Sequence, residues 1–170
     1  SGLQLKKVQT GSEKRQTAWN DLFQKGQQAL ESGNLTQAIE TLSRIGKGSG
    51  QYEEARKLIS TAKKKQVQSL ATTLLEGQQA FNRGDWETAI ASLSKLQSTD
   101  PGYALAQELL QKARGNQKKQ ASEAAALRRG KQALARGQFD TAASHLTQVP
   151  KGSSSYTEAQ TLLQEARSQK

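Results

Sequence analysis

One pattern occurs three times in the chain and constrains the fold more than any other feature. The stretch GQQALESGNLTQAIETL at residues 26–42 returns as GQQAFNRGDWETAIASL at 77–93 and as GKQALARGQFDTAASHL at 130–146. Small residues and leucine recur at matched places, which are Gly26, Ala29, Gly33, Ala38 and Leu42, then Gly77, Ala80, Gly84, Ala89 and Leu93, then Gly130, Ala133, Gly137, Ala142 and Leu146. Such self-similarity predicts an array of like structural units.

Each copy continues into a further periodic segment that begins with Tyr52, Tyr103 or Tyr156. After the tyrosine, apolar residues follow at three- and four-residue steps: Ala55, Leu58 and Ala62; Ala106, Leu109 and Ala113; Ala159, Leu162 and Ala166. This spacing places them on one face of a helix. Each copy is therefore predicted to form helix A, a tight turn, helix B, a loop and helix C.

The small residues have predicted positions within this unit. Gly26 and Ala38 are expected where helix A crosses helix B, because small side chains let two helix backbones approach closely. Gly33 and its counterparts are expected to end helix A, since glycine adopts the left-handed conformation at little cost. Asn34 and Asp85 follow directly and are predicted to cap helix B.

The ends of helix C carry three further expectations. Asp100-Pro101 is predicted to open the second helix C, as a cap followed by proline at the first helical position. The first junction, residues 62–70, has no helix breaker, so whether helix C continues into the next helix A stays open. The second junction is two residues longer, which would rotate an unbroken helix by roughly 200°. A break is therefore predicted at Gly115-Asn116.

Composition limits the classes of function. Hydrophobic residues make up 34% of the 170 residues, which suits a helical protein with a thin core. No apolar run approaches the ~18 residues that span a membrane, and the absence of cysteine excludes disulfides and thiolate metal sites. The net charge of +10 favours anionic partners such as nucleic acid, acidic lipid or acidic protein, or serves solubility alone.

Catalytic chemistry is not expected. The only histidine, His145, is matched by Thr41 and Ser92 in the other copies and is expected at the surface. The segment GKGSG at 46–50 lacks the pattern of a phosphate-binding loop and is interpreted as a connector. No enzyme activity, metal, cofactor or small-molecule ligand is therefore predicted.

Positive charge is the one polar feature that recurs. The predicted basic ridge, a candidate site for a polyanion or an acidic partner, consists of Lys14, Arg15, Lys63, Lys64, Lys65, Arg114, Lys118, Lys119, Arg128, Arg129, Lys131 and Arg167. The alternative is that helix C-termini favour cations through the helix dipole and that the junctions need solvation. Nucleic acid binding would favour interleaved aromatic residues, and only Trp19 is a candidate.

These residues resemble the tetratricopeptide repeat family. The second copy matches best, with GDWETAIASL at 84–93 followed by STDP at 98–101. The family period is about 34 residues, so the spacings here imply an added third helix in each repeat. A clamp for a peptide carboxylate is not expected, because Gln27, Gln78 and Lys131 replace the family's asparagine.

The resemblance implies a right-handed α-solenoid and a non-catalytic protein–protein interaction scaffold. Residues 1–10 are expected to be the end of a preceding helix or a cloning remnant, and 11–170 a single repeat domain with units of about 11–65, 66–118 and 119–170. The parent would be a larger bacterial protein in the cytoplasm or periplasm that holds partners in an assembly. The alternative is a basic solenoid that binds nucleic acid or another polyanion directly.

Overall fold

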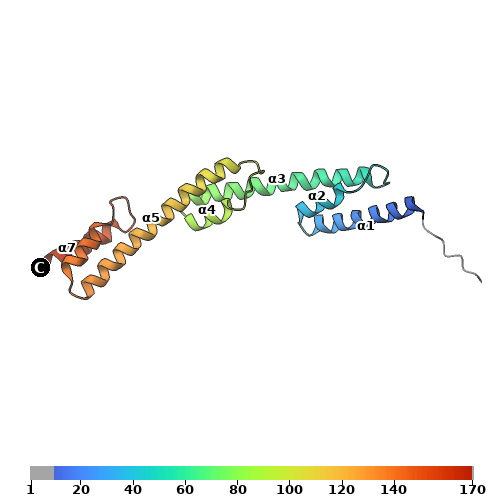
Figure 1. Ribbon diagram of the computed structural model, residues 1–170. Coiled ribbons are helices and arrows are strands. Elements are labelled where there is room, and N and C mark those ends of the chain that lie inside the picture. The colour runs from blue at the N-terminus through green and yellow to red at the C-terminus, as the bar shows by residue number, and fades with distance from the viewer. Residues whose placement is uncertain (1–9, 170) are drawn as a thin grey trace, which may run out of the picture. The chain divides into compact units, whose positions relative to one another are not determined.

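The computed structural model describes residues 10–169, and in this part of the chain it contains seven helices and no strand (Figure 1). The predicted all-α class is confirmed. The helices are α1 (Gly11–Glu31), α2 (Leu35–Ser43), α3 (Tyr52–Asn82), α4 (Trp86–Leu93), α5 (Tyr103–Ala135), α6 (Phe139–Thr147) and α7 (Tyr156–Ser168). The expectation for residues 1–9 lies outside the described residues, and Thr10 caps α1.

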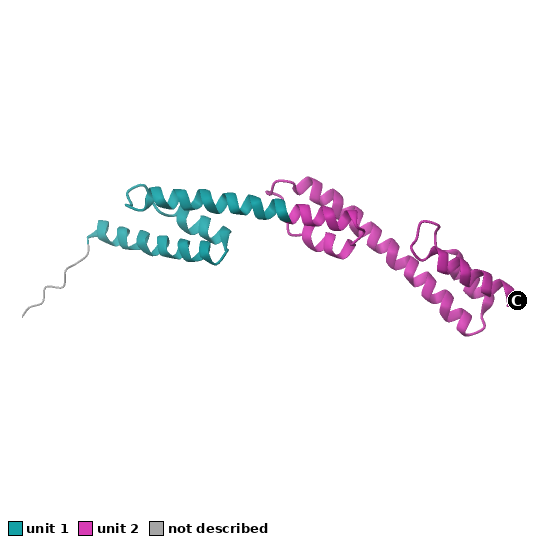
Figure 2. Ribbon diagram, turned by 180° about the vertical axis from the view of Figure 1, so that it is seen from behind, with its two compact units in different colours: residues 1–72 teal, residues 73–170 magenta. Residues whose placement is uncertain are grey.

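The chain divides into two compact units, residues 1–72 and residues 73–170 (Figure 2). Unit 1 contains α1, α2 and the first part of α3. Unit 2 contains the remainder of α3 together with α4 to α7. The arrangement of three repeat units as a right-handed solenoid stays a prediction.

The predicted ends of the helices are largely confirmed. Gly33, Gly84 and Gly137 have φ angles of 77°, 75° and 70° and form the turn between helix A and helix B in each copy. Helices α3 and α7 begin at Tyr52 and Tyr156, where the periodic segments of the first and third copies begin. Helix boundaries in this chain therefore follow from local backbone chemistry.

The N-caps of helix B differ between copies. The Asn34 side chain accepts a hydrogen bond from the Gln37 N–H at 3.4 Å, and Asp85 accepts one from the Thr88 N–H at 3.2 Å, as predicted. Hydrogen bonding from the Thr88 side chain, followed by its backbone N–H, holds the pKa of Asp85 below its usual value. Gln138 occupies this place in the third copy and makes no side-chain cap bond.

Helix A and helix B meet at the predicted small residues. A Cβ atom added to Gly77 would lie 2.6 Å from Leu93 Cγ, too close for any real contact. The other two copies repeat this overlap, between Gly26 and Leu42 and between Gly130 and Leu146. The matched alanines and leucines of helix B are completely or almost completely buried: Ala38, Ala89, Ala142, Leu42, Leu93 and Leu146. These contacts form the core of each copy.

The predicted start of the second helix C is wrong by two residues. Helix α5 begins at Tyr103 and is preceded by Gly102 with a φ of 84°. The Asp100 carboxylate instead accepts a hydrogen bond from the Gln97 N–H at 2.7 Å, which closes a turn in the loop. Because Asp100 is used there, Pro101 lies before the helix and not at its first position.

The predicted break at Gly115-Asn116 is also wrong, since α5 is continuous from Tyr103 to Ala135. Leu110 and Gly130 are both buried and lie twenty residues apart on α5, which places them roughly 200° apart around the helix. Helices α4 and α6 therefore pack against opposite faces of α5. A single glycine costs a helix only about 1 kcal/mol, so Gly115 does not interrupt it. Helix α3 is likewise unbroken, which answers the question left open at the first junction.

Candidate partner-binding groove

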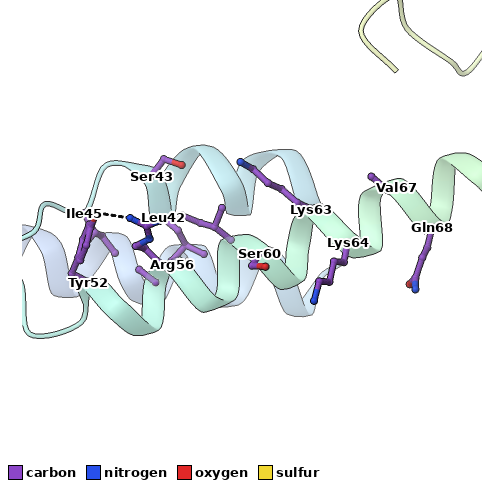
Figure 3. Close-up of a pocket in the computed structure, with 12 residues that line it drawn as sticks. Leu42, Ser43, Ile45, Tyr52, Arg56, Ser60, Lys63, Lys64, Val67 and Gln68 are labelled. Carbon is purple, nitrogen blue, oxygen red and sulfur yellow. Dashed lines mark hydrogen bonds between the residues drawn. The ribbon is translucent and has the colours of Figure 1, made fainter. Parts of the chain in front are cut away.

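A groove of about 800 Å³ lies in unit 1 between the C-terminal end of α2 and one side of α3 (Figure 3). Two residues of α2 and one that follows it close one end, while α3 supplies the length of the groove. The lining residues are Leu42, Ser43, Ile45, Tyr52, Ala55, Arg56, Ile59, Ser60, Lys63, Lys64, Val67 and Gln68.

The floor of the groove is apolar. Leu42, Ile45 and Ala55 are buried and belong to the core of unit 1, while Ile59 is half-buried. Val67 lies near the far end and keeps 53% of its surface exposed. The groove therefore offers a row of apolar side chains that changes from buried to exposed along α3.

Arg56 is held at the closed end of the groove. Its guanidinium donates a hydrogen bond to the Tyr52 hydroxyl at 3.2 Å and lies 5.8 Å from the centre of the tyrosine ring (Figure 3). The hydrogen bond to Tyr52 raises the pKa of Arg56 above its usual value. A cation oriented by one hydrogen bond is thus present beside the apolar floor.

The groove is electropositive along its length. Its twelve lining residues include three cations, Arg56, Lys63 and Lys64, and no carboxylate. In Figure 3 the two lysine side chains extend to opposite sides of α3. Within residues 10–169 neither lysine forms an ion pair, so both charges are open to a partner.

The groove differs from the matched surfaces of the other copies at its floor. Ile59 is half-buried, whereas the residues at the same place, Leu110 and Leu163, are each only 4% exposed. The residue at this position of the repeat is thus buried in the core of the second and third copies, but lines the groove in the first.

The polar rim differs as well. Arg56 is exposed where the other copies carry Gln107 and Gln160, both half-buried. Val67 occupies the place that Lys118 has in the second copy. Sequence reasoning missed the groove because it followed the positions that the copies share. The sequence signal for the groove was the set of positions at which the first copy differs from the other two, such as Arg56 and Val67.

All the cations of the predicted basic ridge are exposed. Lys63 and Lys64 are brought together with Arg56 in the groove of unit 1. Lys131, in unit 2, forms an ion pair with Glu158, and Lys119 lines a separate crevice. A continuous ridge through all three copies stays a prediction.

Two single residues differ from expectation. Trp19, the candidate for base stacking, is half-buried, and a Cβ atom on Gly46 would lie 2.8 Å from its ring. The indole is therefore packed against the loop after α2. His145 is also half-buried and its Nδ1 has no hydrogen-bond partner in residues 10–169, while Ser92 at the matched place is 6% exposed. The prediction that this place lies at the surface is wrong, because it adjoins the leucine at the helix crossing.

Among residues 10–169, no group of histidine, cysteine, aspartate or glutamate side chains could hold a metal ion. In the same part of the chain, each helix is too short or too polar to cross a membrane. No family model matches the sequence, and no curated protein or solved structure matches it.

Proposed function

We propose that the chain is a non-catalytic protein–protein interaction module, a tetratricopeptide-like scaffold within a larger bacterial protein that holds partners in an assembly. The groove of unit 1 carries this proposal, because it combines exposed Val67 with three exposed cations. Exposed apolar surface rimmed by polar groups is typical of interaction sites. The repeat resemblance supports the same class of function.

The chemistry of the groove is suited to binding. Its lining contains no histidine, cysteine or carboxylate that could act as a base or nucleophile. The Ser43 hydroxyl donates a hydrogen bond to the backbone oxygen of Ile39 at 2.6 Å and is occupied by the helix. The groove is therefore suited to holding a surface in place.

A photo-crosslinking experiment tests the proposal. A photoreactive residue replaces Val67 in the full chain, and a second chain carries the same residue at Lys118, its exposed counterpart in the second copy. We expect a discrete protein to be captured from the source cell at position 67 and not at 118. The captured protein is then purified and its binding measured with Val67→Lys, which should weaken it at least about tenfold. Equal capture at both positions would contradict the proposal.

A second candidate function is direct binding of a polyanion. The observation in its favour is the set of exposed cations on α5 in unit 2: Arg114, Lys118, Lys119, Arg128 and Arg129. Fluorescence anisotropy with labelled nucleic acid at about 50 and about 200 mM salt tests it. Affinity that falls about 10³-fold with added salt would mean that several phosphates are neutralised together. Absence of binding at the lower salt concentration would exclude it.

A further inference from the structure

We infer that the groove of unit 1 binds an acidic amphipathic α-helix of a partner protein, which lies along α3. This inference rests on the proposed function and specifies the chemistry of the partner. Three features of the groove carry it: its length and walls, the spacing of its apolar side chains, and the sign of its charges.

The walls of the groove favour a helical partner. Its α3 residues run from Tyr52 to Gln68, a length of about 24 Å, which a helix of about sixteen residues matches. An extended peptide gains its affinity from hydrogen bonds to an exposed backbone edge. The backbone groups of α3 are already paired within the helix, so the groove offers side chains alone. Recognition by side chains along a helix is the helix-in-groove mode.

The apolar side chains have the spacing of helix-to-helix contacts. Ile59 and Val67 are eight residues apart on α3, which separates them by about 12 Å along the axis. A partner helix with apolar residues at i and i+8 would place one residue opposite each of them. Val67 has 53% of its surface exposed. Burial of Val67 by such a residue would therefore give the main apolar contribution to binding.

The charges select the sign of the partner. Arg56, Lys63 and Lys64 flank the floor, with no carboxylate among the lining residues. Long cationic side chains can lay their stems on an apolar partner while their charged ends pair with carboxylates at its edges. Arg56 is already oriented by Tyr52, so less freedom is lost when it meets a carboxylate. A basic or neutral helix would leave these cations unpaired and bind more weakly.

The test is a selection of displayed helical peptides on the full chain, with the peptide surface positions randomised. We expect the enriched peptides to carry apolar residues at three- and four-residue spacing together with an excess of aspartate and glutamate. Synthetic versions should bind Val67→Ser and Lys63→Glu at least about tenfold more weakly. Lys118→Glu, the control in unit 2, should change their affinity by less than about twofold.

Weaker binding by these variants would not reflect unfolding. Val67, Lys63 and Lys118 are all exposed, and surface substitutions leave stability nearly unchanged. Arg56→Gln introduces the residue of the other copies and gives a second, conservative loss of charge. Enriched peptides without an acidic excess, or peptides that bind Val67→Ser equally well, would overturn the inference.

The two proposals fail separately. Capture of a protein at position 67 alongside neutral or non-helical selected peptides would overturn the acidic helix and leave the interaction function standing. Selected acidic helices that depend on Val67, together with equal capture at both crosslinking positions, would overturn the interaction function in the cell. The preference of the groove for an acidic helix would then stand.

Discussion

The first and third copies of the repeat fill the space between helix A and the loop after helix B in different ways. In the first copy the indole of Trp19 packs against Gly46 and Gly48. In the third copy Glu123 takes the place of Trp19 and lines a crevice of about 180 Å³ beside Gly152. One Glu123 carboxylate oxygen is buried without a hydrogen-bond partner in residues 10–169. An apolar filler in one copy thus corresponds to a polar crevice in another.

The helix crossing, by contrast, is the same in both copies. Ala38 and Ala142 are fully buried, and Leu42 and Leu146 are at most 1% exposed. A common core therefore fixes the helices, while the positions around it are free to change. The groove follows the same rule, since Arg56, Ile59 and Val67 are peculiar to the first copy but adjoin core residues that the copies share.

The largest predicted effect comes from breaking the shared core. Ala142→Asp places a carboxylate at a fully buried position and should cost about 3 to 5 kcal/mol of unfolding free energy, because the charge has no partner there. Ala38→Asp should cost a similar amount in the first copy. Urea unfolding followed by circular dichroism measures both. Thr141→Asp is the control, because Thr141 is exposed on the same helix. If Ala38→Asp had no effect, the two cores would not be equivalent.

The sequence predicted the features that depend on nearby residues. The turn at Gly33 requires a left-handed backbone, and the cap at Asn34 needs only the next turn of helix. The errors involved competition over longer distances. Asp100 serves the loop and does not cap α5, and α5 stays continuous through Gly115 because its partners pack on opposite faces.

The groove was not predicted for a related reason. A position such as Val67 is an ordinary surface residue unless the neighbouring helix leaves it open, and that depends on packing. The predicted basic residues located part of the site, since Lys63 and Lys64 line it. Arg56 was missed because Gln107 and Gln160 replace it in the other copies.

A smaller effect is expected from the glycines at the helix crossing. Gly130→Ala would drive its new Cβ into Leu146 and should cost about 1 to 3 kcal/mol through overpacking. Gly26→Ala should cost a similar amount in the first copy. Gly115→Ala is the matched control, because no atom lies within 4 Å of the added Cβ. It should stabilise α5 by about 0.5 to 1 kcal/mol, since alanine is the better helix former. Stabilisation by all three substitutions would mean that the crossing does not depend on close backbone approach.

The smallest predicted effect tests the difference between the copies directly. Glu123→Leu installs the residue of the second copy, Leu70, and removes the buried oxygen without a partner. It should raise the unfolding free energy by about 1 kcal/mol, the usual scale for an unsatisfied buried group. Urea unfolding at about 150 mM salt limits the effect of the changed net charge.

Gln117→Leu is the control for that substitution, because Gln117 is exposed on the same helix and gains the same apolar side chain. If Glu123→Leu raised the unfolding free energy well above that of this control, the crevice would be a packing defect of the third copy. A loss relative to the control would mean that the Glu123 carboxylate is satisfied by water held in the crevice. The first and third copies would then differ in hydration, with an indole ring in one replaced by bound water in the other.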